Sequence, residues 1–148
     1  MDISKLQFDS KVIDELEIDS SQRETLELIL NENDERKIEE MIENMIPIES
    51  ETLSFDGAEE KDKKGTYNSI KCEVYKVLCT NDSTYAKERV ALGDGLRGII
   101  PILATSFVGT LGLTLPLTIV TGIIVALLML VIKIGNNAWC SRNKMVCG

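Results

Sequence analysis

The first sixty residues place apolar side chains at helical spacing. Residues 10–20 are read as a short helix or an extended entry segment. Ser21 followed by Glu24 matches a capping box, which predicts the start of a helix at this point. A second helix at about residues 34–46 ends before Pro47, because proline disfavours helix at the preceding residue. The two apolar stripes are Leu26, Ile29 and Leu30, then Ile38, Met41, Ile42, Met45 and Ile46.

A loop and two further helices are expected before the long apolar segment. Residues 49–65 have the composition of a loop, rich in serine and charged residues. One helix is predicted from about Thr66 or Asn68 to Thr80, and a shorter one at about residues 84–92. The expected hinge residues are Gly93, Gly95, Gly98 and Pro116.

Residues 98–132 form a run of thirty-five positions without a charged side chain. As one helix, this run would measure about 52 Å, whereas the hydrocarbon core of a bilayer is about 30 Å thick. Pro116 is the expected break. Two arrangements remain open. We favour antiparallel spans at 98–114 and 117–134; the other is one span at 113–134 preceded by a re-entrant element at 98–112.

Basic residues flank this uncharged run on both sides, and Trp139 follows it, where an indole suits the headgroup level of a membrane. The positive-inside rule places both flanks in the cytoplasm, which requires an even number of crossings. The polar N-terminus lacks a basic, apolar leader and is expected to stay in the cytoplasm. The flanking residues are Lys87, Arg89 and Arg97 before the run and Lys133, Arg142 and Lys144 after it.

The predicted fold class is therefore all-α. It comprises a cytosolic helical domain at 1–97 that includes the loop 49–65, a two-helix transmembrane hairpin at 98–134 and a cytosolic tail at 135–148. Because the soluble part alone buries only a thin core, we expect a symmetric homo-oligomer, with a tetramer as the candidate assembly.

The net charge of −8 is unevenly distributed along the chain. Residues 1–60 carry 5 basic and 19 acidic side chains, and residues 61–97 carry 8 basic and 5 acidic ones. Residues 98–148 carry 3 basic side chains and no acidic one. An acidic head, a weakly basic neck and an uncharged segment are thus three different environments.

Small and hydroxyl-bearing residues recur at helical spacing within the uncharged run. Such residues let membrane helices pack closely, or they line a pore when several copies form a ring, and both interpretations remain open. Without Asp, Glu or His inside the run, a proton relay is disfavoured. The candidate pore-lining residues are Thr105, Gly109, Thr110, Thr114, Thr118 and Thr121.

The sequence lacks the usual components of an enzyme. It has no histidine, no glycine-rich phosphate loop and no spacing typical of a metal site, so we expect no catalysis, no cofactor and no metal. In a cytoplasmic protein the four cysteines are expected to be reduced. Cys72 and Cys79 lie seven residues apart on one face of a helix, which suits core packing.

Basic and aromatic side chains gather between residues 61 and 89. Lysine and arginine neutralise phosphates and tyrosine rings stack on bases, so this neck is a candidate site for a short single-stranded DNA or a nucleotide. The same composition is expected beside anionic lipid headgroups. The candidate ligand residues are Lys71, Lys76, Lys87, Arg89, Tyr67, Tyr75 and Tyr85.

The overall plan resembles a family of bacterial membrane proteins. The stretch from Gly122 to Leu128 (GIIVALL), leading into Lys133 to Cys140 (KIGNNAWC), resembles the membrane effectors of Hailong-type anti-phage defence systems. The resemblance covers roughly the last 60 residues. It implies a channel domain topped by a soluble crown that binds a DNA oligomer, which keeps the channel shut until phage infection removes it.

Together these features predict an oligomeric membrane channel or pore-forming, toxin-like effector, gated by its cytosolic domain and acting in abortive anti-phage defence. The expected location is the bacterial inner membrane with both termini cytoplasmic, and the expected partners are lipid, further copies of the chain and the anionic ligand. A holin-like lesion former and a membrane-anchored adaptor without a pore are the alternatives.

Overall fold

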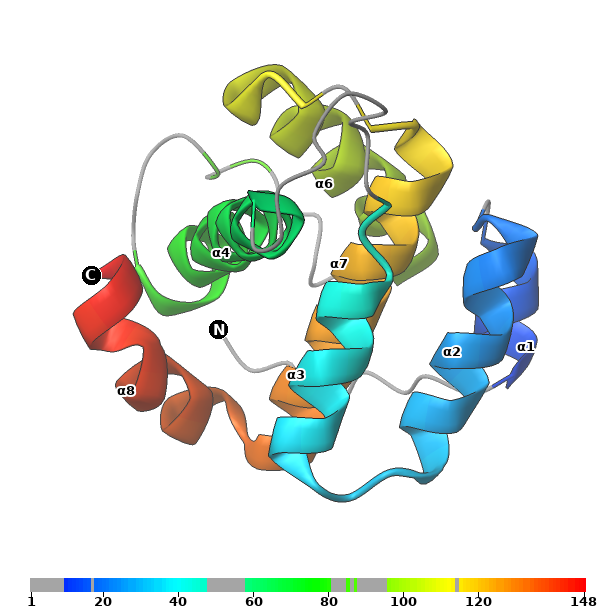
Figure 1. The fold of residues 1–148 in the computed structure, drawn as a ribbon, viewed down its shortest axis with the longest axis horizontal. Helices are drawn as coiled ribbons and strands as arrows, with labels where there is room; N and C mark the ends of the chain where they lie inside the picture. Colours follow the sequence, from blue (N-terminus) through cyan, green and yellow to red (C-terminus); the bar gives the residue numbers. More distant parts are fainter. Residues whose placement is uncertain are drawn as a thin grey trace.

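The computed structural model describes residues 10–16, 18–47, 58–80, 85, 87, 96–113 and 115–148. These residues form α-helices joined by turns, without a strand among them, which confirms the all-α fold class. The helices are α1 (Ser10–Glu15), α2 (Ser20–Asn31), α3 (Glu35–Asn44), α4 (Ala58–Cys79), α6 (Leu96–Leu111), α7 (Leu117–Ile134) and α8 (Asn136–Cys147) (Figure 1).

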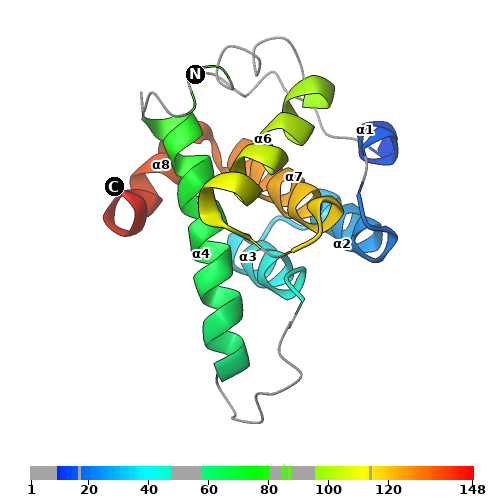
Figure 2. The same cartoon turned by 90° about the horizontal axis from the view of Figure 1, so that it is seen from above.

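Helix α7 runs through the middle of the molecule. In Figure 2, α6 lies above α7 and α2 and α3 lie below it, while α4 and α8 pack beside it. Every residue from Val120 to Val131 is buried. A helix that is apolar on all sides has to be covered on all sides, and here the other helices provide the cover.

Helices α2 and α3 cover α7 with amphipathic faces. Leu26 and Ile29 of α2 and Ile38 and Ile42 of α3 are fully buried. The charged positions between them, such as Glu40, face solvent. The sequence pattern therefore predicted these two helices and their inner faces correctly.

The cap of α2 differs from the predicted capping box. Asp19 is the N-cap, and its carboxylate accepts hydrogen bonds from the Ser21 amide at 2.9 Å and from the Ser21 hydroxyl at 2.6 Å. Ser21 thus donates to the cap instead of acting as the cap, because α2 already begins at Ser20 and Asp19 takes the cap position. Asp34 caps α3 in the same way through the Arg36 amide, at 3.0 Å.

Helix α4 begins at Ala58, well before the predicted start at Thr66 or Asn68. The predicted loop at 49–65 is wrong from residue 58 onward, because the alanine, glutamates and lysines there are good helix formers and outweigh Gly65. Residues 49–57, and most of the helix expected at 84–92, lie outside the described residues.

The turn between α6 and α7 lies where the sequence predicted a break. Helix α6 ends at Leu111, and Gly112 follows with a φ of +63°, a conformation that favours glycine. Pro116 is the N-cap of α7, whose bounds match the predicted second span. The segment predicted as a tail, 135–148, contains a helix: α8 follows α7 after one glycine, Gly135, with a φ of +101°.

We expect Asp19→Ala to lower Tm by roughly 2 to 4 °C, because it removes the acceptor for two donors at the start of α2. The Ser21 hydroxyl, and then the Ser21 amide, lower the pKa of Asp19 below its ordinary value of 3.8. The cap therefore contributes fully above pH 3.8, and its contribution is lost as the pH falls through the lowered pKa.

The measurement is thermal unfolding followed by circular dichroism at pH 7 and at pH 2. Glu24→Ala is the matched control, since Glu24 is exposed and would matter only in the capping box. An equal loss of Tm in both variants would contradict the assignment of Asp19 as the cap.

Candidate functional site

Helix α7 is the candidate functional element. Among the described residues it alone is long and apolar enough to cross a membrane, with 18 residues that span about 27 Å. The buried core helix of a soluble protein has the same length and composition. Helix α6 has 16 residues, and its apolar part, Ile100–Leu111, is shorter than a span.

The predicted pore-lining residues do not share one face. Thr105, Gly109 and Thr110 are exposed on α6, Thr118 is half-buried and Thr121 is buried inside the molecule. The Thr105 hydroxyl donates to the Pro101 carbonyl at 2.9 Å, and the Thr121 hydroxyl donates to the Leu117 carbonyl at 2.8 Å. Both hydroxyls thus bond to their own helices. Thr114 lies outside the described residues.

Helix α2 packs closely against α7 at Gly122. A Cβ at this position would lie 2.2 Å from Gln22 Oε1 and 3.4 Å from the Ile18 side chain. Gln22 is buried, and its Nε2 donates to the Met45 carbonyl at 2.9 Å, so its amide can move only by breaking that bond. Gln22 Oε1 has no hydrogen-bond partner. Gln22 of α2 is therefore hydrogen-bonded to the end of α3 and packed against the backbone of α7.

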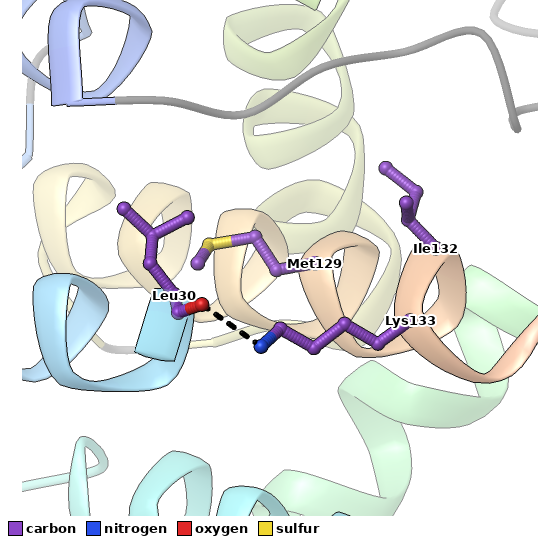
Figure 3. Close-up of a pocket in the computed structure, with 4 residues that line it drawn as sticks. All are labelled: Leu30, Met129, Ile132 and Lys133. Atoms are coloured by element: carbon purple, nitrogen blue, oxygen red, sulfur yellow. Dashed lines mark hydrogen bonds between the residues drawn. The ribbon is translucent and has the colours of Figure 1, made fainter. Parts of the chain in front are cut away.

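At the other end of α7, Lys133 holds the C-terminus of α2. Its Nζ donates to the carbonyls of Leu30, at 3.0 Å, and of Glu32, at 2.5 Å. Helix α2 has no basic residue in its own last turn, so Lys133 supplies the positive charge that a helix C-terminus favours. Figure 3 shows this contact beside a cavity of about 80 Å³, which is lined by Leu30, Met129, Ile132 and Lys133. Ligand pockets begin at roughly 300 Å³, so this cavity is too small to be one.

Two disulfides join α4 to α8, which corrects the expectation of four reduced thiols. Cys72 pairs with Cys147 and Cys79 pairs with Cys140. The two cysteines of α4 are seven residues apart, and so are the two cysteines of α8. Because the two helices run antiparallel, each cysteine of α4 meets one of α8. This equal spacing was the signal in the sequence, and considering each helix alone missed it.

Trp139 lies in the same contact. Its ring is fully buried, with its centroid 6.4 Å from that of Tyr75 in α4, instead of facing the surroundings as a headgroup anchor would. On the outside of α8, Arg142 forms an ion pair with Glu35 of α3. Helix α8 is therefore a packed part of the bundle.

The candidate anionic-ligand residues are mostly covered. Tyr67, Tyr75 and Tyr85 are buried, and Lys71 is only 8% exposed, over the Tyr67 ring at 5.2 Å. Lys87 is exposed, and Arg89 lies outside the described residues. In this conformation the three rings therefore offer no open face on which a base could stack.

Carboxylates lie close to these tyrosines as well. The Tyr85 hydroxyl donates to the buried carboxylate of Glu73 at 2.5 Å, and Lys76 pairs with the other oxygen of that carboxylate at 2.9 Å. Burial, and then the carboxylates of Glu39 and Glu43, raise the pKa of the Tyr67 phenol, which stays neutral. Negative charge is thus already present around the tyrosines.

A larger open cavity, of about 540 Å³, lies at the start of α3. It is lined by Asp34, Glu35, Arg36 and Glu39, so three carboxylates face one guanidinium. This balance repels a phosphate chain. Within the part of the chain that the structure describes, no cluster of side chains could hold a metal ion.

Of the predicted hinge residues, Gly98 lies within the first turns of α6 and Pro116 caps α7. Gly93 and Gly95 lie outside the described residues. No family model, curated protein or solved structure matches this chain.

We expect Gly122→Ala to destabilise the fold by about 1 to 3 kcal/mol, because the new methyl group displaces the buried Gln22 amide. Gly109→Ala is the matched control: nothing lies within 4 Å of its Cβ, so it should stabilise α6 by about 0.5 to 1 kcal/mol.

Urea unfolding of Gly122→Ala, Gln22→Ala and the double variant measures the coupling between the two positions. The double variant should be less destabilised than the sum of the single variants, because truncating Gln22 removes the clash. Strict additivity would show that the two residues do not touch.

Proposed function

We propose that this chain is a pore-forming membrane effector that keeps its membrane-crossing helix inside a shell of amphipathic helices until it is triggered. In this proposal it acts as a homo-oligomer in the bacterial inner membrane, and pore opening kills or arrests the cell during phage infection. The observation that supports it is α7: twelve consecutive residues without charge, all of them buried inside the molecule.

The energetics of α7 favour such a transition. Lipid tails are about as apolar as leucine, so moving α7 from the protein core into a bilayer changes its own environment little. The cost falls on the covering helices, which must part from it. Separation exposes their apolar faces, and it also breaks two specific contacts: Gln22 against Gly122, and the hydrogen bonds of Lys133 at the end of α2.

The second crossing is assigned to α6. Its 16 residues span about 24 Å, and the turn at Gly112 would have to enter the bilayer to make up the missing length. Thr105 and Gly109 lie on its exposed face, where small residues allow a second copy to pack closely. Two crossings place both termini on the cytoplasmic side.

Control by a nucleic acid or nucleotide would require the bundle to open. In the covered state the three tyrosines are buried, and the larger cavity at α3 carries a negative charge. A ligand of this class would therefore bind the opened form better than the covered one and would shift the population toward it, which is the opposite of the ligand-closed channel that the resemblance implies.

The experiment uses purified full-length protein and dye-filled liposomes of phosphatidylethanolamine and phosphatidylglycerol. We expect dye release that rises steeply with protein concentration. Gly109→Glu should reduce the release on the order of a hundredfold, because a charge in a membrane-crossing helix costs about 2.5 to 3.5 kcal/mol. Its fold should remain intact, since Gly109 is exposed with open space around it.

Asn137→Glu is the matched control, because Asn137 is exposed on α8 outside the uncharged run. Equal release from Gly109→Glu and Asn137→Glu would contradict the crossing assigned to α6. Liposomes that stay intact with every variant would overturn the pore.

The full coverage of α7 also favours a second candidate, a water-soluble helical binding module in which α7 is simply the core helix. Flotation separates the two candidates. A module remains at the bottom of the gradient, an anchored adaptor floats with the liposomes without releasing dye, and a pore-forming protein floats and releases dye.

A further inference from the structure

Helices α4 and α8 are joined by two disulfides, which lie about two helical turns apart along each helix. Cys72 and Cys147 have their Cα atoms 5.0 Å apart, and Cys79 and Cys140 have theirs 5.7 Å apart. Because the two bonds lie seven residues apart along α8, this helix can neither rotate away from α4 nor slide along it. All four cysteines are half-buried, so a small reductant can reach them.

This double link restrains α7 as well. Helix α8 follows α7 after the single residue Gly135, so the C-terminal end of α7 stays beside α4 as long as both bonds are intact. Apart from the disulfides, α8 packs on α4 and α7, and two of its side chains make contacts of different strength. Trp139 is buried against Tyr75, and Arg142 forms an ion pair with Glu35 at the surface, where such pairs contribute little.

We propose that the two disulfides form a redox lock on α7, and that a dithiol reductant releases it by thiol–disulfide exchange. The effect of the lock on dye release rests on the proposed function, whereas the separation of α8 from α4 on reduction does not. Oxidised protein holds α7 in the bundle, and reduced protein lets α8 and the end of α7 separate from α4.

The chemistry balances without any further component. One thiolate of the dithiol attacks a sulfur of a protein disulfide and forms a mixed disulfide, with one cysteine leaving as a thiolate that takes up a proton. The second thiol of the reductant then displaces the other cysteine. Each cycle converts one protein disulfide to two thiols and the dithiol to its own disulfide, with two electrons transferred.

The test follows Trp139, which is the only tryptophan of the chain and lies in the contact that the lock holds. Oxidised full-length protein is compared with protein treated with dithiothreitol, which is itself a dithiol. We expect the tryptophan emission to shift to the red on reduction while circular dichroism shows that the helices persist. In the liposome assay, dye release should rise by roughly tenfold or more, because two crosslinks restrict the released state by more than that factor.

Cysteine variants separate the lock from side effects of the reductant. The variant with all four cysteines replaced by serine should show red-shifted emission and fast dye release without reductant, and should not respond to it. Cys72→Ser with Cys147→Ser leaves one disulfide, and this variant should keep Trp139 buried until reductant is added.

The outcomes distinguish the lock from the pore. Exposure of Trp139 with no dye release in any state leaves the lock standing and overturns the proposed function. Dye release that is measurable and equal for oxidised and reduced protein overturns the lock alone, as does tryptophan emission that reduction leaves unchanged. Loss of all helix on reduction also overturns the lock, because the disulfides would then support the whole fold.

Discussion

The need to cover α7 determines most of this structure. A helix of 18 residues whose single charged side chain, Lys133, lies near its end must be covered along most of its length, because the rest of its surface is almost entirely hydrocarbon. Every other long helix of the described chain packs against it, and the charged residues of α2 and α3 lie on the outer faces of these two helices. The acidic faces of α2 and α3 are the outer surface of a cover whose inner surface is isoleucine and leucine.

The sequence allowed good predictions where one local pattern decided the outcome. The bounds of α7, the break at Pro116 and the apolar stripes of α2 and α3 follow from the length of an uncharged run, a missing amide proton and a period of 3.6 residues. The start of α4 and the cap of α2 were missed because two local preferences competed there. Asp19 outcompeted Ser21, and good helix formers outweighed a glycine.

The candidate site was harder to predict because it depends on pairs of helices. Seven-residue spacing of cysteines is visible in each helix alone, but only their antiparallel contact turns it into two disulfides. In the same way, the sequence predicted that Tyr67 and Lys71 lie in a helix, but it did not predict that other helices cover their side chains. Gln22 is held against Gly122 by its hydrogen bond to the Met45 carbonyl, and no pattern in the sequence predicts this contact.

The nested disulfides also divide the molecule into two parts of different connectivity. Residues 72 to 147 form a covalent ring that contains α6 and α7, whereas α1, α2 and α3 lie outside it and are held by packing, Lys133, Gln22 and surface ion pairs. In the oxidised molecule the N-terminal helices can therefore act as a lid. They can separate from one side of α7 while the ring still covers its other side. Exposure of α7 and its release from α4 are therefore two separate events.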